Sequence, residues 1–256
     1  MNSSKLVHFR DLLTELVQRD MRLRYKRSLL GVLWSLLNPL LQLVVFSFIF
    51  GVVLPLNIPH FPLFLFTGLL AWNWFQSSLI EATGAIVDNR ELIRRPGFPD
   101  AILPLVSVST NFLHYLLALP VLLVFVAASG IPFHPVLLAL PLVLAVQFLI
   151  TLGLAYVVAA LHVRFRDTRY LLGIALLLGF YLSPVFYDAA AIPAAYQAIY
   201  RLNPMVTLLE AYRAMLMEGV FPSALMLLAW AVVGALVLLL GVRLFRRMSV
   251  HFAEEL

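Results

Sequence analysis

Residues 28–80 of the chain read SLLGVLWSLLNPLLQLVVFSFIFGVVLPLNIPHFPLFLFTGLLAWNWFQSSLI, without a single Asp, Glu, Lys or Arg. This run is more than twice as long as the ~20 residues that cross a bilayer as a helix. Near its middle, residues 54–62 read LPLNIPHFP, and prolines at this density end a helix. The sequence therefore predicts two membrane-spanning helices that are joined by a short turn.

The same pattern continues through the rest of the chain. Residues 101–163 are also free of charged side chains and contain the turn signal SGIPFHP at residues 129–135, whereas residues 170–187 and 219–242 are shorter uncharged stretches. The chain is 62% hydrophobic and 12% charged, with a mean hydropathy of +0.96, against roughly 25% charged residues in a soluble domain. We predict an all-α polytopic membrane protein, a single membrane domain over residues 1–256, with six transmembrane helices at approximately 29–54, 63–85, 103–127, 137–161, 170–187 and 222–242.

The positions of the cations predict the orientation of these spans. Of the 18 Lys and Arg residues, all but Arg201 and Arg213 fall before the first span, between spans two and three, between spans four and five, or after span six. By the positive-inside rule, these segments and both termini are cytoplasmic. The formal net charge of +5 reflects this asymmetry, so we expect no nucleic-acid partner.

Several classes of chemistry are excluded by composition. The absence of cysteine excludes thiolate metal sites and cysteine nucleophiles, and no two histidines have the H-x-x-x-H spacing, so we expect no metal site. The only lysines, Lys5 and Lys26, do not follow glycine, which excludes a Walker A loop. If nucleotide energy drives this protein, another chain must bind the nucleotide. Glu81 and His114 are too isolated in sequence for an intramembrane enzyme.

The segment before the first span, residues 1–27, has the period of an amphipathic helix. Leu6, Phe9, Leu13, Leu16 and Val17 fall on one side of a helical projection, opposite the polar side chains. We predict a cytoplasmic interface helix that ends in a cationic patch. This patch either anchors the topology by binding anionic lipid or attracts a phosphate-bearing lipid substrate.

Two loops are long enough to hold short helices. Residues 88–100 form the first loop, in which Asp88 can cap a helix with an apolar tip at Leu92 and Ile93. This segment is either a mechanical coupling helix or a solvated connector. Residues 188–220 form an outer pair of re-entrant or interfacial helices, and the second of these begins at Asn203 with a proline in its first position.

Ionisable and aromatic side chains inside or beside the spans leave alternatives open. Glu81 either forms a structural ion pair with an arginine or acts as a gate. Glu210 and Arg213 can pair at i, i+3, for local support or for substrate contact. Aromatic side chains form either the interfacial belt or the wall of a sugar-conducting channel. The candidates for a channel or gate are Trp34, Trp72, Trp74, Phe75, Glu81, Tyr181 and Tyr187.

Together, these segments resemble a known family. Residues 17–31 read VQRDMRLRYKRSLLG and are followed by Trp34 and by NPL at residues 38–40. FPLFL at 61–65, FRD at 165–167, SPVFY at 183–187 and NP at 203–204 follow in order, and Tyr212 and Arg213 come after them. This pattern is similar to that of the ABC-2 type permeases that export polysaccharide or polyol phosphate, and it covers nearly the whole chain.

The resemblance implies a half-transporter in the cytoplasmic (inner) membrane. Two copies of the chain would form a homodimer with a channel between them, and two copies of a cytoplasmic ABC ATPase would bind ATP and Mg, so this chain would carry no cofactor and catalyse no reaction. The cargo would be a lipid-linked glycan, foremost O-antigen, and the alternatives are capsule, teichoic acid, or a drug or small lipid. The ATPase-coupling residues would be Asp88, Arg90, Glu91, Leu92, Ile93, Arg94 and Arg95, with Arg166 and Asp167 as a second contact. The residues that receive the lipid phosphate would be Arg19, Arg22, Arg24, Tyr25, Lys26 and Arg27.

Overall fold

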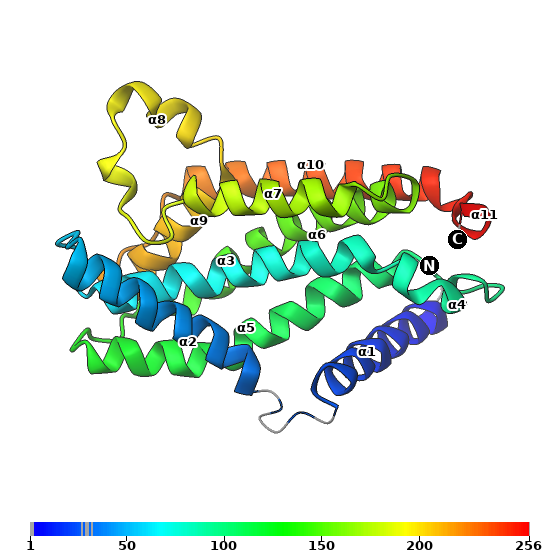
Figure 1. Ribbon diagram of the computed structural model, residues 1–256, viewed down its shortest axis with the longest axis horizontal. Coiled ribbons are helices and arrows are strands. Elements are labelled where there is room, and N and C mark those ends of the chain that lie inside the picture. Colours follow the sequence, from blue (N-terminus) through cyan, green and yellow to red (C-terminus); the bar gives the residue numbers. More distant parts are fainter. Residues whose placement is uncertain (1–2, 27, 29–30, 32, 256) are drawn as a thin grey trace.

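The computed structural model describes residues 3–26, 28, 31 and 33–255, and within these residues the chain is helical and contains no strand. Figure 1 shows the long helices side by side, with both termini and α4 at one end and α8 at the other. The helices are α1 (Ser3–Tyr25), α2 (Leu33–Phe48), α3 (Phe61–Gly84), α4 (Arg90–Ile93), α5 (Ile102–Ala128), α6 (Leu140–Arg164), α7 (Thr168–Tyr181), α8 (Ala194–Tyr200), α9 (Pro204–Arg213), α10 (Ala224–Ser249) and α11 (Phe252–Glu255). A π-helical turn extends α2 to Val53, and another extends α9 to Glu218.

In the described part of the chain, five helical segments are long and apolar enough to cross a membrane, so the chain is a multi-pass membrane protein. They are Leu33–Val53, Phe61–Gly84, Ile102–Ala128, Pro135–Arg164 and Ala224–Ser249.

Only part of the fifth predicted span, residues 170–187, is helical in the structure. Its helix, α7, has 14 residues and ends at Tyr181. At 1.5 Å per residue, α7 is about 21 Å long, which is shorter than the ~30 Å hydrocarbon core of a bilayer. Pro184 follows soon after, and its ring and missing N–H prevent the helix from continuing.

Helix α3 lies at the centre of the fold. It packs against α2, α5, α6, α7 and α9, and Leu65, Phe66 and Leu69 have no exposed surface. The helix that follows the first turn signal is therefore surrounded by protein.

Helices α6 and α10 approach each other unusually closely. A Cβ atom on Gly153 of α6 would lie 2.6 Å from the backbone nitrogen of Leu238, and one on Gly241 of α10 would overlap the carbonyl oxygen of Gly153. At contacts between membrane helices, small residues let the two backbones approach each other closely. These glycines therefore fix the pairing of α6 with α10.

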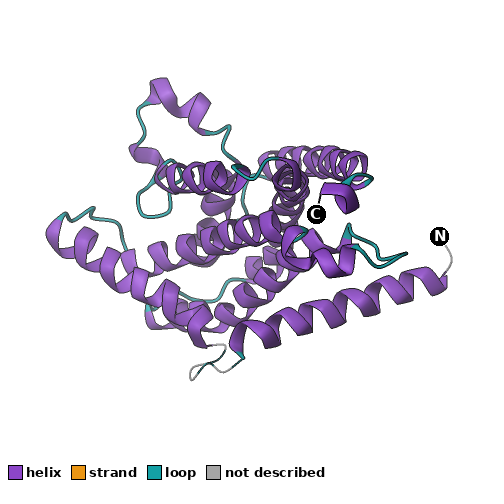
Figure 2. Cartoon of the chain, turned by 45° about the vertical axis from the view of Figure 1, so that its right-hand side comes forward, coloured by secondary structure: helices purple, strands orange, loops and turns teal. Residues whose placement is uncertain are grey.

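The outer helices behave differently from each other. Helix α8 projects from the bundle in both views, whereas α9 lies against α3, α6 and α10 (Figures 1 and 2). Leu208, Leu209 and Tyr212 of α9 are fully buried, while Ile199 of α8 is 72% exposed. Asn203 caps α9 as the sequence predicts, because its side-chain oxygen accepts a hydrogen bond from the Met205 N–H at 3.0 Å.

Helix α1 stands at the edge of the bundle and runs obliquely to the spans (Figure 2). Leu16 and Val17, from its predicted apolar side, are buried, and α1 contacts α5. The opposite side carries the exposed side chains of Thr14, Glu15 and Gln18. Part of the apolar face of α1 thus packs against protein.

We expect Gly153→Ala to lower the thermal unfolding midpoint of the detergent-solubilised protein, because overpacking of this kind costs about 1–3 kcal/mol. The matched control is Gly173→Ala in α7, whose new Cβ meets no described atom within 4 Å. The control should unfold at the same or a higher temperature, since alanine favours a helix over glycine by about 0.5–1 kcal/mol. Equal midpoints for the two variants would contradict the close packing of α6 and α10.

Candidate functional site

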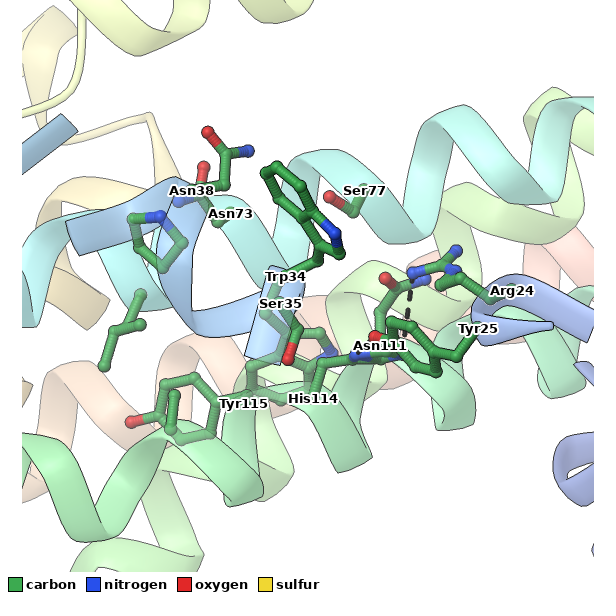
Figure 3. Close-up of a pocket in the computed structure, with 14 residues that line it drawn as sticks. Arg24, Tyr25, Trp34, Ser35, Asn38, Asn73, Ser77, Asn111, His114 and Tyr115 are labelled. Carbon is green, nitrogen blue, oxygen red and sulfur yellow. Dashed lines mark hydrogen bonds between the residues drawn. The ribbon is translucent and has the colours of Figure 1, made fainter. Parts of the chain in front are cut away.

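Four helices converge on one polar cavity of about 300 Å³ (Figure 3). The end of α1, the start of α2 and the middle parts of α3 and α5 contribute its walls. The polar side chains that line it include Arg24, Tyr25, Asn38, Asn73, Ser77, Asn111 and His114. Because these side chains come from segments spread over residues 24–118, only the folded chain creates the cavity.

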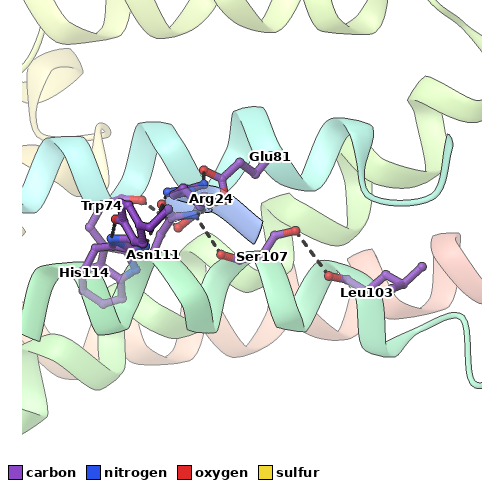
Figure 4. Close-up of polar contacts among 9 residues, drawn as sticks. Arg24, Trp74, Glu81, Leu103, Ser107, Asn111 and His114 are labelled. Carbon is purple, nitrogen blue, oxygen red and sulfur yellow. Dashed lines mark hydrogen bonds and ion pairs between the residues drawn. The ribbon is translucent and has the colours of Figure 1, made fainter. Parts of the chain in front are cut away.

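An ion pair holds the end of α1 beside this cavity (Figure 4). The Arg24 guanidinium contacts the Glu81 carboxylate of α3, and Asn111 of α5 donates a hydrogen bond to the same carboxylate at 2.7 Å. The Tyr25 hydroxyl lies 2.9 Å from Nδ1 of His114. Glu81 thus has the arginine partner that was one of its two predicted roles, and His114 is hydrogen-bonded.

The cationic patch at the end of α1 divides into two sides. Arg24 pairs with Glu81 on the side of the bundle, and Arg19 is tethered to the bundle by a hydrogen bond that it donates to the side-chain oxygen of Asn89 at 3.0 Å. Arg22 and Lys26 are exposed and line a separate groove of about 580 Å³ together with Arg19. Arg27, the remaining predicted member, lies outside the described residues. The cations that face away from the bundle are therefore fewer than the sequence pattern suggests.

The predicted coupling segment forms a short helical turn at the same end of the molecule as both termini (Figure 1). Leu92 and Ile93 are half-buried against the core of this chain, so they do not form a free apolar tip. Asp88 does not cap α4: the N-cap residue is Asn89, and its side chain makes no capping hydrogen bond. The exposed side chains of the segment are charged, namely Asp88, Arg90, Glu91, Arg94 and Arg95.

The turn between α6 and α7 lies close to this segment. Arg169, at the start of α7, lines a cavity of about 280 Å³ together with Asp88, Asn89 and Glu81. Arg166 and Asp167, the predicted second contact, are exposed on the turn that precedes α7. The structure therefore brings the α6–α7 turn towards the segment before α4.

At the end of the bundle near α8, a buried arginine fixes α9. The Arg213 guanidinium is 6% exposed, donates a hydrogen bond to the Val185 carbonyl at 2.9 Å and lies 3.4 Å from the ring centre of Phe64. It also donates to the Phe64 carbonyl at 3.3 Å. Arg213 does not pair with Glu210, which was the expected partner. Burial raises the pKa of Glu210, although nearby Arg201 acts in the opposite direction.

A second buried network joins α9 to the spans. The Tyr212 hydroxyl donates to the side-chain oxygen of Gln147 at 2.8 Å, and the Gln147 amide donates to the Ala71 carbonyl at 2.8 Å. Sequence reasoning did not identify Gln147, Asn73 or Asn111. Each of them is a side-chain amide within a charge-free run, and this position could have marked it as a candidate. An amide in a membrane helix needs a hydrogen-bonding partner, which another segment can supply.

The aromatic candidates fall into two groups. Trp72, Trp74 and Phe75 of α3 are only 2%, 3% and 8% exposed, so they lie inside the protomer. Trp34 and Tyr181 are more than half exposed. Tyr187 is half-buried and accepts a hydrogen bond from the Tyr200 hydroxyl at 3.0 Å. Trp34 and Tyr181 therefore present their rings at the protomer surface.

The described residues contain no group of three or more His, Asp or Glu side chains placed to hold a metal ion. The polar sites are instead built from amides, hydroxyls and ion pairs.

Comparison with known proteins gives the family. Residues 11–217 match the family described as ABC-2 type transporter. The chain is 39% identical to the O-antigen export system permease protein RfbA of Myxococcus xanthus over 98% of each chain, and 32% identical to the RfbA protein of Klebsiella pneumoniae over 96% of this chain and 95% of that protein. It is 28% identical to the polysialic acid transport protein KpsM of Escherichia coli, over 89% and 90% of the two chains. This chain belongs to the ABC-2 type transporter family.

Proposed function

We propose that this chain is the permease subunit of an ATP-driven exporter that moves a lipid-linked polysaccharide, foremost O-antigen, across the cytoplasmic membrane. The observation that carries the proposal is the near full-length similarity to two O-antigen export permeases. The similarity to a polysialic acid transport protein supports capsule as the second candidate cargo. Teichoic acid, a drug and a small lipid are the remaining alternatives.

A homodimer with a channel between the protomers is supported by unpartnered apolar faces on α2 and α7. Leu176 is the buried residue of α7, whereas Leu171, Ile174 and Leu178 are 66%, 57% and 55% exposed. Apolar faces of this kind mark contacts with lipid or with a second protein. Trp34 of α2 and Tyr181 of α7 would then line the channel, where flat rings can stack on sugar rings.

Six membrane crossings with cytoplasmic termini are the topology that we favour. Helix α7 and residues 182–187 would together complete the fifth crossing. The common position of both termini and α4 in Figure 1 supports an even number of crossings. The cation distribution supports the cytoplasm as that side.

A separate ATPase is expected because this chain has no Gly-Lys pair for a Walker A loop. Helix α4 and the α6–α7 turn would contact it from the cytoplasm. The exposed charges of α4 suit a groove of mixed charge, while half-buried Leu92 and Ile93 would transmit motion into the core of the permease. ATP binding to the partner would then bias the channel between two states.

Helix α1 would move together with α4. It is joined to α3 by the Arg24–Glu81 pair and to the residue before α4 by the hydrogen bond from Arg19 to Asn89. Motion at α4 would therefore reach α1, whose exposed Arg22 and Lys26 would attract the diphosphate of the lipid carrier.

Loss of this chain should cause lipid-linked glycan to accumulate on the inner leaflet of the cytoplasmic membrane, because the polymer is completed but not exported. The measurement is extraction of lipid-linked glycan together with surface labelling of the polymer. A complementing copy of the chain should restore export. Unchanged glycan export combined with new drug sensitivity would instead favour the small-molecule alternative.

Arg94→Glu should reduce the amount of ATPase that co-purifies with the permease by about tenfold, because reversing a charge at a complementary interface creates repulsion. Export should fall in parallel. Arg247→Glu at the end of α10 is the matched control, since Arg247 is also an exposed arginine at the same end of the molecule but lies outside α4. Equal ATPase recovery for both variants would contradict the role of α4.

A double-mutant cycle should show that Arg24 and Glu81 are energetically coupled. We expect Arg24→Gln and Glu81→Gln together to destabilise the protein by about 0.5–3 kcal/mol less than the sum of the single changes, as measured by denaturant unfolding in detergent. The control cycle uses Arg10 and Asp11, a pair on the same helix with side chains that are 74% and 53% exposed. That pair should couple by only about 0–0.5 kcal/mol. Similar coupling in both cycles would argue against a specific tether.

A further inference from the structure

The cavity beside the end of α1 is open to a ligand from the protomer surface. Trp34 and Asn38 of α2 are exposed at its edge, while Trp74 and Tyr115 form a buried wall at 3% and 4% exposure (Figure 3). Its volume of about 300 Å³ lies at the lower end of the range of about 300–1,000 Å³ for small-molecule sites. The cavity thus suits a ligand the size of one sugar residue.

The lining of the cavity is polar but carries little free charge. The described residues that line it include no carboxylate, and its guanidinium, that of Arg24, is engaged by Glu81. Asn38 and Ser77 make no side-chain hydrogen bond to the rest of the described chain. Polar groups between membrane helices are costly unless they find partners, so this cavity favours an occupant with many hydrogen-bonding groups.

Sugar hydroxyls match this lining better than phosphate or an apolar molecule does. Each hydroxyl both donates and accepts, as each side-chain amide does through its two ends. The indole rings of Trp34 and Trp74 add flat apolar walls for the carbon face of a sugar ring. An apolar occupant would leave the amides unpaired, which costs binding free energy.

The charges on the other side of α1 complement this neutral cavity. Arg22 and Lys26 are spaced i, i+4 and line the outer groove, whereas Arg24 and Tyr25 line the cavity. One helix end therefore presents on one side Arg22 and Lys26, which have no salt-bridge partner among the described residues and share their groove with Arg19 and Glu15, and on the other side a neutral polar cavity. A sugar attached to a lipid diphosphate has the same two chemistries next to each other.

We propose that this cavity binds the first sugar of the lipid-linked glycan, next to the diphosphate, so that the permease distinguishes a glycosylated carrier from a bare one. The inference rests on the proposed function, because it assumes a lipid-linked glycan as cargo. It adds a specificity site within each protomer, separate from any channel between protomers.

The test measures binding of two probes to the full-length permease, co-purified with its ATPase, in lipid nanodiscs without nucleotide. One probe is a polyprenyl diphosphate that carries a single hexose, and the other is the same lipid without the sugar. We expect the wild-type protein to bind the hexose-bearing probe about tenfold more tightly, because each added hydrogen bond contributes modestly to affinity. The double variant Asn38→Ala/Ser77→Ala should lose most of that preference and keep its affinity for the bare lipid.

Ser47→Ala is the matched control, because Ser47 lies on α2 but does not line the cavity. It should keep the full preference for the sugar. Equal binding of both probes by the wild-type protein, or an undiminished preference in the double variant, would overturn the sugar site and leave the proposed function intact. If the wild-type protein binds neither probe, the proposed function fails together with the inference.

Discussion

The hydrocarbon of a bilayer offers no water to a polar group, so a polar side chain between the spans is costly unless it finds a hydrogen-bonding partner. This constraint determines where α9 lies. Arg213 is satisfied by the carbonyls of Phe64 and Val185, and Tyr212 by Gln147. Because these partners belong to α3, α6 and the segment after α7, α9 is held in the interior although it is too short to cross a membrane. Helix α8, by contrast, projects from the bundle and is tied to the segment after α7 by the hydrogen bond from Tyr200 to Tyr187.

The same constraint organises the opposite end of the molecule. Glu81 lies in a membrane helix, and its carboxylate is stabilised by Arg24 from α1 and Asn111 from α5. The pairing of Glu81 with Arg24 joins α1 to α3, the helix that leads into α4. Because Arg24 is engaged in this pair, exposed residues such as Arg22 and Lys26 are left to attract anions. A structural requirement of the membrane thus separates the tethering cations from the cations that remain available to a ligand.

Several predictions that rest on local chemistry were confirmed. The proline-rich turn at residues 54–62 does separate α2 from α3, and Asn203 does cap α9. Predictions about the direction of side chains were weaker. Trp72, Trp74 and Phe75 were candidates for a channel, yet α3 is enclosed by its neighbours. Helices that face lipid and helices that face protein are both apolar, so their hydrophobic pattern does not tell them apart. The shortness of α7 was also missed, because residues 182–187 are as uncharged as the helix before them.

By itself, the sequence determined that the chain is helical and embedded in a membrane, that the chain has no Walker A loop, and which family pattern its segments follow. These properties depend on composition and on neighbouring residues. Only the tertiary structure decided which polar side chains meet. Arg24 and Glu81 are separated by 57 positions, and Arg213 and Phe64 by 149, so nothing local indicates either pair. The cavity, the two sides of the α1 end and the burial of α9 all result from such distant pairs, because a polar group in a membrane takes whichever partner the fold brings within reach.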